Sequence, residues 1–287
     1  MQFDVEKIKF LRNETQAGIM DCQTALINSK GDIEQAIVFL RKQGIKRASE
    51  ITGKKTLGEG LTNVIIDNNE AVLYELNSET DFVAKNKIFL DLLNLLGKIL
   101  LKEVKPNMNI DEILNLNIKD KKIKDLLFET TSIIQEKICL RKVIKVIKKD
   151  DENFEMYKHQ NGFISVLVIA QNSNKNSKKD ILEDICMHIA AKKPRFLNKE
   201  QIDSEILNQE KLIIEAQVNK ELIKEKKVNI KEKIIEGRLN KFIQNICFME
   251  QPFVKNPEQK VRDYLKEKKI KIINYWRLEV GEGLKKI

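Results

Sequence analysis

A hairpin followed by a helix is predicted twice along this chain, and this repeated order constrains the fold more than any other feature of the sequence. The first hairpin is indicated by the turn residues Asp67 to Glu70 between two β-rich runs, and the second by Asn161-Gly162 ahead of another such run. The predicted elements are strands over 61–66 and 71–76 with a helix over 86–102, then a strand over 163–170 with a helix over 178–192. Two similar α+β halves are therefore expected.

Before the first hairpin, the apolar residues of 1–44 recur at helical spacing in three runs. Gly18 and Gly31 separate these runs, and Gly44 is predicted to end the third. The pattern predicts a small bundle of three helices. The polar, glycine-bearing stretch 45–60 that follows predicts a linker.

A long helical run lies beyond the second half. From Lys199 to Ile246 the apolar residues keep helical spacing with little Gly or Pro, and the polar stretch 224–229 interrupts them. This pattern predicts an antiparallel pair of helices that projects from the body of the protein. The remaining predicted elements are helices over 110–116, 123–139 and 261–268 and strands over 143–147 and 270–280.

The composition excludes several classes of protein. The 287 residues are 42% hydrophobic, which is enough for real cores, so collagen-like, disordered and small disulfide-rich chains drop out. No apolar run reaches the roughly 20 residues of a membrane-spanning helix, and Asp4 and Glu6 stand where a secretory signal would be apolar. We therefore expect a cytoplasmic protein without a membrane partner. The four widely spaced cysteines predict reduced, mostly buried thiols.

The net charge of +9, from 52 Lys and Arg against 43 Asp and Glu, raises the alternative of an RNA-binding protein. However, the lysines are scattered among acidic residues, as in 119–125 and 220–233, and aromatic residues make up only 6% of the chain. This pattern favours solvated helix faces over a basic stripe interleaved with stacking rings. No direct binding of nucleic acid is therefore expected, and RNA binding stays the first alternative.

An enzyme is the second alternative. The chain has two histidines, His159 and His188, and neither has an Asp, Cys or Ser at a spacing typical of a catalytic triad or a metal site. The pair Cys186 and His188 is better explained as packing of a helix. The segment 53–58 matches half of a P-loop, but Glu59 stands where a phosphate-binding lysine is required. We expect neither a cofactor nor a bound metal.

The segment Glu79 to Asn86, with the sequence ETDFVAKN, stands out between a predicted strand and a predicted helix. An Asp followed by a large apolar Phe, with little chain to cover them, suits insertion into a cleft of another protein. The alternative is ordinary: Asp81 caps the next helix and Phe82 packs beneath it. Composition alone favours this alternative.

Several further blocks of sequence can be read together with this segment. They are LRNETQAGIMDCQTAL (11–26) with GDIEQAIVFLRKQG (31–44), YKHQNGFISVLV (157–168), MHIAAKKPRF (187–196), EGRLNKF (236–242), QPFV (251–254) and EVGEG (279–283). In this order, and along nearly the whole chain, the blocks closely resemble the elongation factor Ts family, the guanine-nucleotide exchange factors of elongation factor Tu. Any one block is a weak signal, whereas the ordered set is very specific.

The resemblance implies an α+β fold that agrees with the pattern of predicted elements. It implies an N-terminal three-helix ubiquitin-associated-like domain, a linker, a core of two related α+β subdomains, and a protruding antiparallel coiled coil. The corresponding residues are 1–44 for the helical domain, 45–60 for the linker, 61–140 for the core N-subdomain, 141–198 and 247–287 for the core C-subdomain, and 199–246 for the coiled-coil insertion.

The resemblance also implies function through binding rather than covalent catalysis. Such a protein binds elongation factor Tu with its GDP, disturbs the partner's Mg²⁺ and phosphate site, and promotes exchange of GDP for GTP during polypeptide elongation. By the same resemblance Thr80, Asp81, Phe82 and Val83 form the segment that intrudes near the Mg²⁺ site, with Phe82 wedged between helices. Because Mg²⁺ demands near-octahedral geometry, small displacements of its ligands weaken its binding.

Contacts outside this segment are implied as well. His159 matches a histidine that supports the intruding phenylalanine, while Arg12, Ile19 and Met20 fall where the N-terminal domain touches the partner's nucleotide-binding domain. Packing within its own domain is the alternative for each residue, most strongly for Ile19. The coiled coil would contact the partner more remotely, and the complex is expected to be a heterodimer or a dimer of heterodimers.

Overall fold

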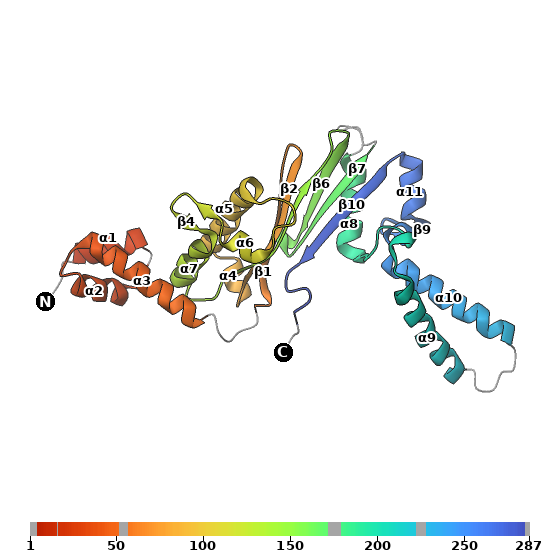
Figure 1. Cartoon of the computed structure of the whole chain (residues 1–287), viewed down its shortest axis with the longest axis horizontal. Coiled ribbons are helices and arrows are strands. Elements are labelled where there is room, and N and C mark those ends of the chain that lie inside the picture. The colour runs from red at the N-terminus through yellow and green to blue at the C-terminus, as the bar shows by residue number, and fades with distance from the viewer. Residues whose placement is uncertain (1–4, 16, 52–56, 172–178, 222–227, 285–287) are drawn as a thin grey trace. The chain divides into compact units, whose positions relative to one another are not determined.

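The computed structural model describes residues 5–15, 17–51, 57–171, 179–221 and 228–284. They form two compact units, and each unit contains both helices and sheet (Figure 1). The first unit comprises Met1–Ile147, Gln160–Ile164 and Leu278–Ile287, and the second comprises Lys148–His159 and Ser165–Arg277. The protein therefore belongs to the α+β class, as predicted, and the second unit is an insertion between segments of the first.

The first unit begins with helices and continues with a small antiparallel sheet. Its helices are α1 (Val5–Thr15), α2 (Ile19–Asn28), α3 (Ile33–Ile51), α4 (Asp81–Ala84), α5 (Lys87–Glu103), α6 (Ile110–Leu114) and α7 (Ile123–Ile134), with a 3-10 turn η1 (Gln160–Gly162). Its strands are β1 (Glu59–Asp67), β2 (Glu70–Ser78), β3 (Asn117–Ile118), β4 (Lys121–Lys122) and β5 (Cys139–Ile147).

Helices α1, α2 and α3 contact one another around a small core of their own. The fully buried residues of this core are Leu11, Cys22, Ala25, Leu26 and Ala36. The three helices confirm the predicted bundle. Its description as a ubiquitin-associated-like domain stays a prediction.

The prediction that Gly44 ends the third helix is wrong, because α3 continues through Gly44 to Ile51. A single Gly costs a helix interior about 1 kcal/mol relative to Ala, and the helix-forming residues around it outweigh that cost. The first residues of the predicted linker 45–60 are therefore helical. Residues 52–56 of that linker lie outside the described part of the chain, and β1 begins at Glu59.

The sheet of the first unit has the strand order β1-β2-β5, with both neighbouring pairs antiparallel. Its first hairpin pairs Asp67 with Glu70 across the turn, as predicted. Helix α5 packs on β1 and β2, and Tyr74 ties them together: its hydroxyl donates to the carbonyl of Leu93 at 2.5 Å and accepts from Nδ2 of Asn63 at 2.8 Å. The hydroxyl hydrogen bonds fix the helix against the central strand.

A β-bulge interrupts the pairing of β2 with β5. Glu75 lies opposite Lys142 and Leu76 opposite Leu140, so Arg141 is the extra residue. Its guanidinium reaches the buried Glu75 carboxylate, with Nη2 at 2.6 Å from Oε2, and also donates from Nη1 to the carbonyl of Glu282 at 3.0 Å. The bulge thus joins the sheet to the segment EVGEG.

The same carboxylate holds the backbone of that segment. Oε1 of Glu75 accepts from the N–H of Gly281 at 2.8 Å. Gly281 has φ +72, and a Cβ added there would lie 2.7 Å from the carbonyl oxygen of Gly58. Both the left-handed backbone and the close approach require glycine at this position.

The second unit combines a sheet with a pair of long helices. Its strands are β6 (Glu152–His159), β7 (Ile164–Gln171), β8 (Pro252–Phe253), β9 (Asn256–Lys260) and β10 (Lys271–Glu279). Its helices are α8 (Lys179–Lys192), α9 (Ser204–Glu221), α10 (Val228–Ile246) and α11 (Val261–Lys268), with short 3-10 turns η2 (Lys199–Gln201) and η3 (Phe248–Glu250). The main sheet has the order β10-β7-β6, so the second hairpin and the last predicted strand are confirmed.

Helices α9 and α10 lie side by side (Figure 1), and the residues that join them, 222–227, are outside the described part of the chain. Ile214 and Val218 of α9 are buried, as expected from their helical spacing. Two neighbouring helices are confirmed here. Their description as a protruding coiled coil, the domain boundaries and the relatedness of the two α+β halves stay predictions.

Candidate functional site

The segment Glu79 to Asn86 folds as a turn after β2, the one-turn helix α4, and the start of α5. Thr80 is the N-cap of α4, and its Oγ1 accepts from the N–H of Val83 at 3.4 Å. Asn86 caps α5, with Oδ1 accepting from the N–H of Ile88 at 2.8 Å. Two caps in seven residues keep the connection short and its backbone hydrogen-bonded.

The side chains of α4 divide into a buried pair and an exposed pair. Val83 and Ala84, 7% and 6% exposed, belong to the core of the first unit. Phe82 is 80% exposed. The interpretation that Asp81 caps the helix while Phe82 packs beneath it is therefore wrong: Thr80 is the cap, and the core takes Val83 instead of the phenyl ring.

Asp81 stands beside Phe82 on the exposed side. Its carboxylate pairs with Lys85 at 2.7 Å, one helical turn along, and both side chains are exposed. The hydrogen bond from Lys85 holds the pKa of Asp81 below its usual value. At neutral pH the segment therefore presents an ionised carboxylate, paired with Lys85, next to an exposed aromatic ring.

Glu136, beyond the end of α7, contacts this segment from a distant part of the sequence. Its carboxylate accepts from the N–H of Thr80 at 3.2 Å and from Thr80 Oγ1 at 3.0 Å. In return Glu79 Oε1 accepts from the N–H of Lys137 at 3.2 Å. Glu136 could not be identified from the sequence, because a contact across 56 residues leaves no spacing signal.

The three predicted partner-binding residues of the helical bundle lie at its surface. Arg12 on α1 is exposed, and Ile19 and Met20 at the start of α2 are 53% and 73% exposed. Packing within the bundle covers less than half of the surface of Ile19. The neighbouring Cys22, in contrast, is fully buried.

His159 belongs to the second unit, where it ends β6 with an exposed side chain. Its Nδ1 lies 3.0 Å from the hydroxyl of Tyr157. Phe82 belongs to the first unit. The predicted support of Phe82 by His159 stays a prediction.

His188 is a buried core residue, as the sequence predicts for this helix. Its Nδ1 accepts from the N–H of Val254 at 3.2 Å, and its Nε2 therefore donates to Gln251 Oε1 at 2.9 Å. Burial lowers its pKa to about 4, so the ring is neutral at physiological pH. Both ring nitrogens form hydrogen bonds that attach the segment following α10 to helix α8. His188 therefore has a structural role and not that of a general base.

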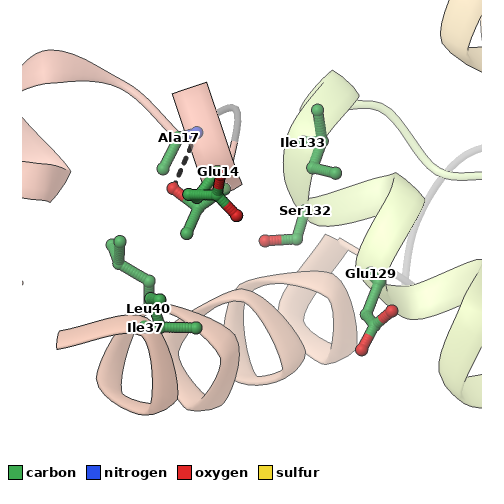
Figure 2. Close-up of a pocket in the computed structure, with 8 residues that line it drawn as sticks. Glu14, Ala17, Ile37, Leu40, Glu129, Ser132 and Ile133 are labelled. Carbon is green, nitrogen blue, oxygen red and sulfur yellow. Dashed lines mark hydrogen bonds between the residues drawn. The ribbon is translucent and has the colours of Figure 1, made fainter. Parts of the chain in front are cut away.

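One cavity of the first unit, of about 180 Å³, lies between the helical bundle and α7. Figure 2 shows Ile37 and Leu40 of α3 on one side and Ser132 and Ile133 of α7 on the other. Small-molecule sites usually enclose about 300–1,000 Å³, so this space is too small for a nucleotide or a drug-sized ligand. We interpret this cavity as a gap in the packing between α3 and α7.

Among the described residues no group of three or more His, Cys, Asp or Glu could hold a metal ion. Within the same residues no helix has the length and apolar character needed to cross a membrane. All four cysteines are free thiols, and Cys22, Cys186 and Cys247 are buried, as predicted.

The chain was compared with known proteins. Residues 79–282 match the family model described as "Elongation factor TS". "Elongation factor Ts" of Phytoplasma mali (strain AT) is 85% identical over 99% of this chain and 100% of that relative. The chain belongs to the elongation factor Ts family. Other members are the proteins of Aster yellows witches'-broom phytoplasma, 47% identical over 98% of this chain and all of that relative, and of Acholeplasma laidlawii, 40% identical over the whole of this chain and 95% of that relative.

Membership of the elongation factor Ts family makes this protein a translation elongation factor. The block QPFV supplies Gln251 and Val254, which hold His188 of the block MHIAAKKPRF. EVGEG supplies the backbone that Glu75 and Arg141 bind. These blocks are thus explained by internal contacts, whereas ETDFVAKN leaves its Phe82 uncovered.

Proposed function

We propose that this protein is a guanine-nucleotide exchange factor of elongation factor Tu, and that it acts by binding rather than by covalent catalysis. One observation carries the proposal: Phe82 is 80% exposed on a short segment whose Val83 and Ala84 are anchored in the core. Phe82 is the most exposed large apolar side chain in the described part of the chain, and aromatic anchors of this kind are enriched at the energetic centre of protein interfaces. Family membership makes elongation factor Tu the partner to test.

The proposed action of the segment Thr80 to Val83 is to displace the surroundings of the partner's Mg²⁺. Phe82 enters between helices of the partner, and the negative Asp81 next to it disturbs the polar network around the metal. Mg²⁺ tolerates little departure from octahedral geometry, so it is lost when its ligands and waters move. Without the metal, the GDP phosphates lose their main charge partner and GDP leaves faster.

Exchange then follows from linkage between two binding equilibria. If the factor weakens GDP binding by some ratio, GDP weakens binding of the factor by the same ratio. Nucleotide that rebinds to the partner therefore expels the factor, which can act again. Because no covalent bond is made or broken, the proposal needs neither a catalytic residue nor a cofactor.

Further contacts belong to the same proposal. Arg12, Ile19 and Met20 contact the partner's nucleotide-binding domain, and their exposure on the helical bundle supports this role. His159 supports Phe82 in the complex. The helices α9 and α10 act as a coiled coil that reaches a more remote part of the partner, in a heterodimer or a dimer of heterodimers.

The proposal is tested by release of labelled GDP from elongation factor Tu in excess unlabelled nucleotide. We expect the native protein to accelerate release, and Phe82→Ala to lower the acceleration at least about tenfold, since a buried aromatic anchor is worth about 2 kcal/mol or more at an interface. Leu95→Ala is the matched control, because Leu95 is an exposed apolar residue of α5 in the same unit. This control is expected to behave as the native protein does.

Two outcomes would count against the proposal. No acceleration by the native protein would exclude exchange activity and favour the RNA-binding alternative, which predicts binding that weakens steeply with salt. Equal loss in Phe82→Ala and Leu95→Ala would show that the effect comes from general loss of apolar surface and not from Phe82.

A further inference from the structure

Helix α4 is too short to hold Phe82 in place by itself. It has four residues, and the first turn of a helix fixes several backbone angles for a single hydrogen bond, so such a helix depends on outside contacts. The burial of Val83 and Ala84 anchors its second half. The exposed Phe82 ring contributes no packing that could orient the first half.

The outside contact at the first half comes from Glu136. The hydroxyl of Thr80 has one proton, which it donates to Glu136 Oε2 at 3.0 Å, and an oxygen lone pair that accepts from the N–H of Val83 at 3.4 Å. The N–H of Thr80 donates to the same carboxylate at 3.2 Å. Glu136 therefore fixes both the backbone entering α4 and the rotamer of the residue that caps it.

Glu136 is itself held by the structure that follows α7. The helix ends at Ile134, and its C-cap residue Gln135 is left-handed with φ +65. The chain then leads into β5, which pairs with β2. Ile138 is buried, and its N–H donates to Thr131 Oγ1 at 3.2 Å. The N–H of Lys137 donates in return to the carboxylate of Glu79 at 3.2 Å, so the two segments are joined by hydrogen bonds in both directions. Hydrogen bonds to a carboxylate are stronger than those between neutral groups, so this connection is rigid.

We propose that Glu136 is a positioning residue for nucleotide exchange: it acts through Thr80 to set the direction in which Phe82 points. The inference rests on the proposed function, since it specifies how Phe82 is held in its orientation before the partner is bound. A side chain that is already oriented loses less entropy when it enters a partner. Loss of Glu136 should therefore slow exchange through the direction of Phe82, since the carboxylate is bound to the N–H and hydroxyl of Thr80.

The test measures GDP release from elongation factor Tu at saturating factor for the native chain, Glu136→Ala, Glu136→Gln, Phe82→Ala and the double variant Glu136→Ala with Phe82→Ala. We expect Glu136→Ala to lower the rate about tenfold, which corresponds to the low end of the range for a single hydrogen bond to a charged group. Glu136→Gln, which keeps an acceptor oxygen for Thr80, should retain an intermediate rate. In the Phe82→Ala background, Glu136→Ala should change the rate less than about twofold, because both act through one ring.

Glu112→Ala is the matched control. Glu112 also accepts from a backbone N–H, that of Asn109 at 2.9 Å, at the start of a short helix in the same unit. This variant should exchange GDP at the native rate. Thermal unfolding of each variant identifies any that fails to fold, and Glu136→Gln then carries the test in place of Glu136→Ala.

The outcomes separate this inference from the proposed function. Acceleration by the native chain together with a native rate for both Glu136 variants would overturn the inference alone. The same tenfold loss from Glu136→Ala with and without Phe82 would also overturn it, because Glu136 would then act elsewhere. Failure of the native chain to accelerate release would instead overturn the proposed function.

Discussion

At the scale of single residues, His188 couples the stability of the second unit to pH. The ring is fully buried, and the N–H of Val254 occupies Nδ1, so a second proton would have to displace that hydrogen bond. Its pKa is about 4 in the folded chain against 6.5 for an ordinary histidine. The unfolded state thus binds more protons between these two values, and stability falls as the pH falls through this window.

We predict that lowering the pH from 7 to 5 costs the native protein about 2 kcal/mol of unfolding free energy through this residue. His188→Gln cannot titrate and should lack this part of the pH dependence, although it is less stable at pH 7. Urea unfolding of both proteins at several pH values measures the difference. Parallel pH profiles for the two proteins would contradict the assignment.

The site residues differ in how far the sequence could predict them. Phe82 was singled out by its neighbours, yet composition favoured a buried ring, since large apolar side chains are usually inside. The structure exposes it because Val83 fills the core position instead. Glu136 could not be predicted at all, because a half-buried glutamate in a chain with 43 acidic residues carries no local mark of its contact with Thr80.

At the scale of elements, the contact of α5 with the sheet depends on Gly97. A Cβ at this position would lie 2.3 Å from Cδ1 of Ile65 and 2.5 Å from the hydroxyl of Tyr74. The hydroxyl is fixed by its bond to the carbonyl of Leu93, so it cannot move aside without breaking that bond. Gly237 of α10 is the opposite case, with nothing within 4 Å of the added atom.

We predict opposite signs for two chemically identical substitutions. Gly97→Ala should destabilise the first unit by about 1–3 kcal/mol through overpacking. Gly237→Ala should stabilise α10 by about 0.5–1 kcal/mol, because Ala is the better helix former and meets no neighbour. Hydrogen exchange in peptides from α5 and α10 measures the change in local stability caused by each substitution. Changes of the same sign in the two helices would contradict the packing argument.

The long helices and strands were largely predictable from periodicity. The short strands β3, β4, β8 and β9 were not predicted, β5 begins at Cys139 and not at Val143, and two helix ends were misplaced. The predicted helix 123–139 stops at Ile134, because Gln135 adopts a left-handed cap and β5 already begins at Cys139. Conversely, α3 runs past Gly44. Both ends depend on competition between local propensity and the sheet or helix next to them, which a window of sequence does not contain.

At the scale of the whole molecule, the first unit is assembled from separate stretches of the chain. Glu75 of β2 carries a buried carboxylate, to which Arg141 of β5 and the N–H of Gly281 donate. Arg141 also donates to the carbonyl of Glu282. A buried carboxylate is tolerated only where charges and hydrogen bonds compensate it. These hydrogen bonds therefore attach the segment that follows β10 to the β1-β2-β5 sheet, whose strands lie in the first half of the chain or close to it.

We predict that Arg141→Ala lowers the stability of the first unit by about 3–5 kcal/mol, since it leaves a buried charge without its cation. The control is Lys142→Ala, which removes a solvent-exposed contact to the same carbonyl of Glu282, 3.2 Å away, and should cost under about 1 kcal/mol. Guanidinium unfolding measures both. Similar costs for the two variants would show that Glu75 finds compensation elsewhere.

The insertion of the second unit also sets an order of events during synthesis. Glu75 and Gly281 are 206 residues apart, and ribosomes add about 5–20 residues per second, so Glu75 waits about 10–40 s for its last hydrogen-bond donor. During that interval the carboxylate must stay hydrated or rely on Arg141 and on Asn77, whose Nδ2 donates to Glu75 Oε1 at 3.0 Å. The speed of the ribosome therefore decides how long each new molecule carries an unfinished first unit, in a protein that itself serves chain elongation.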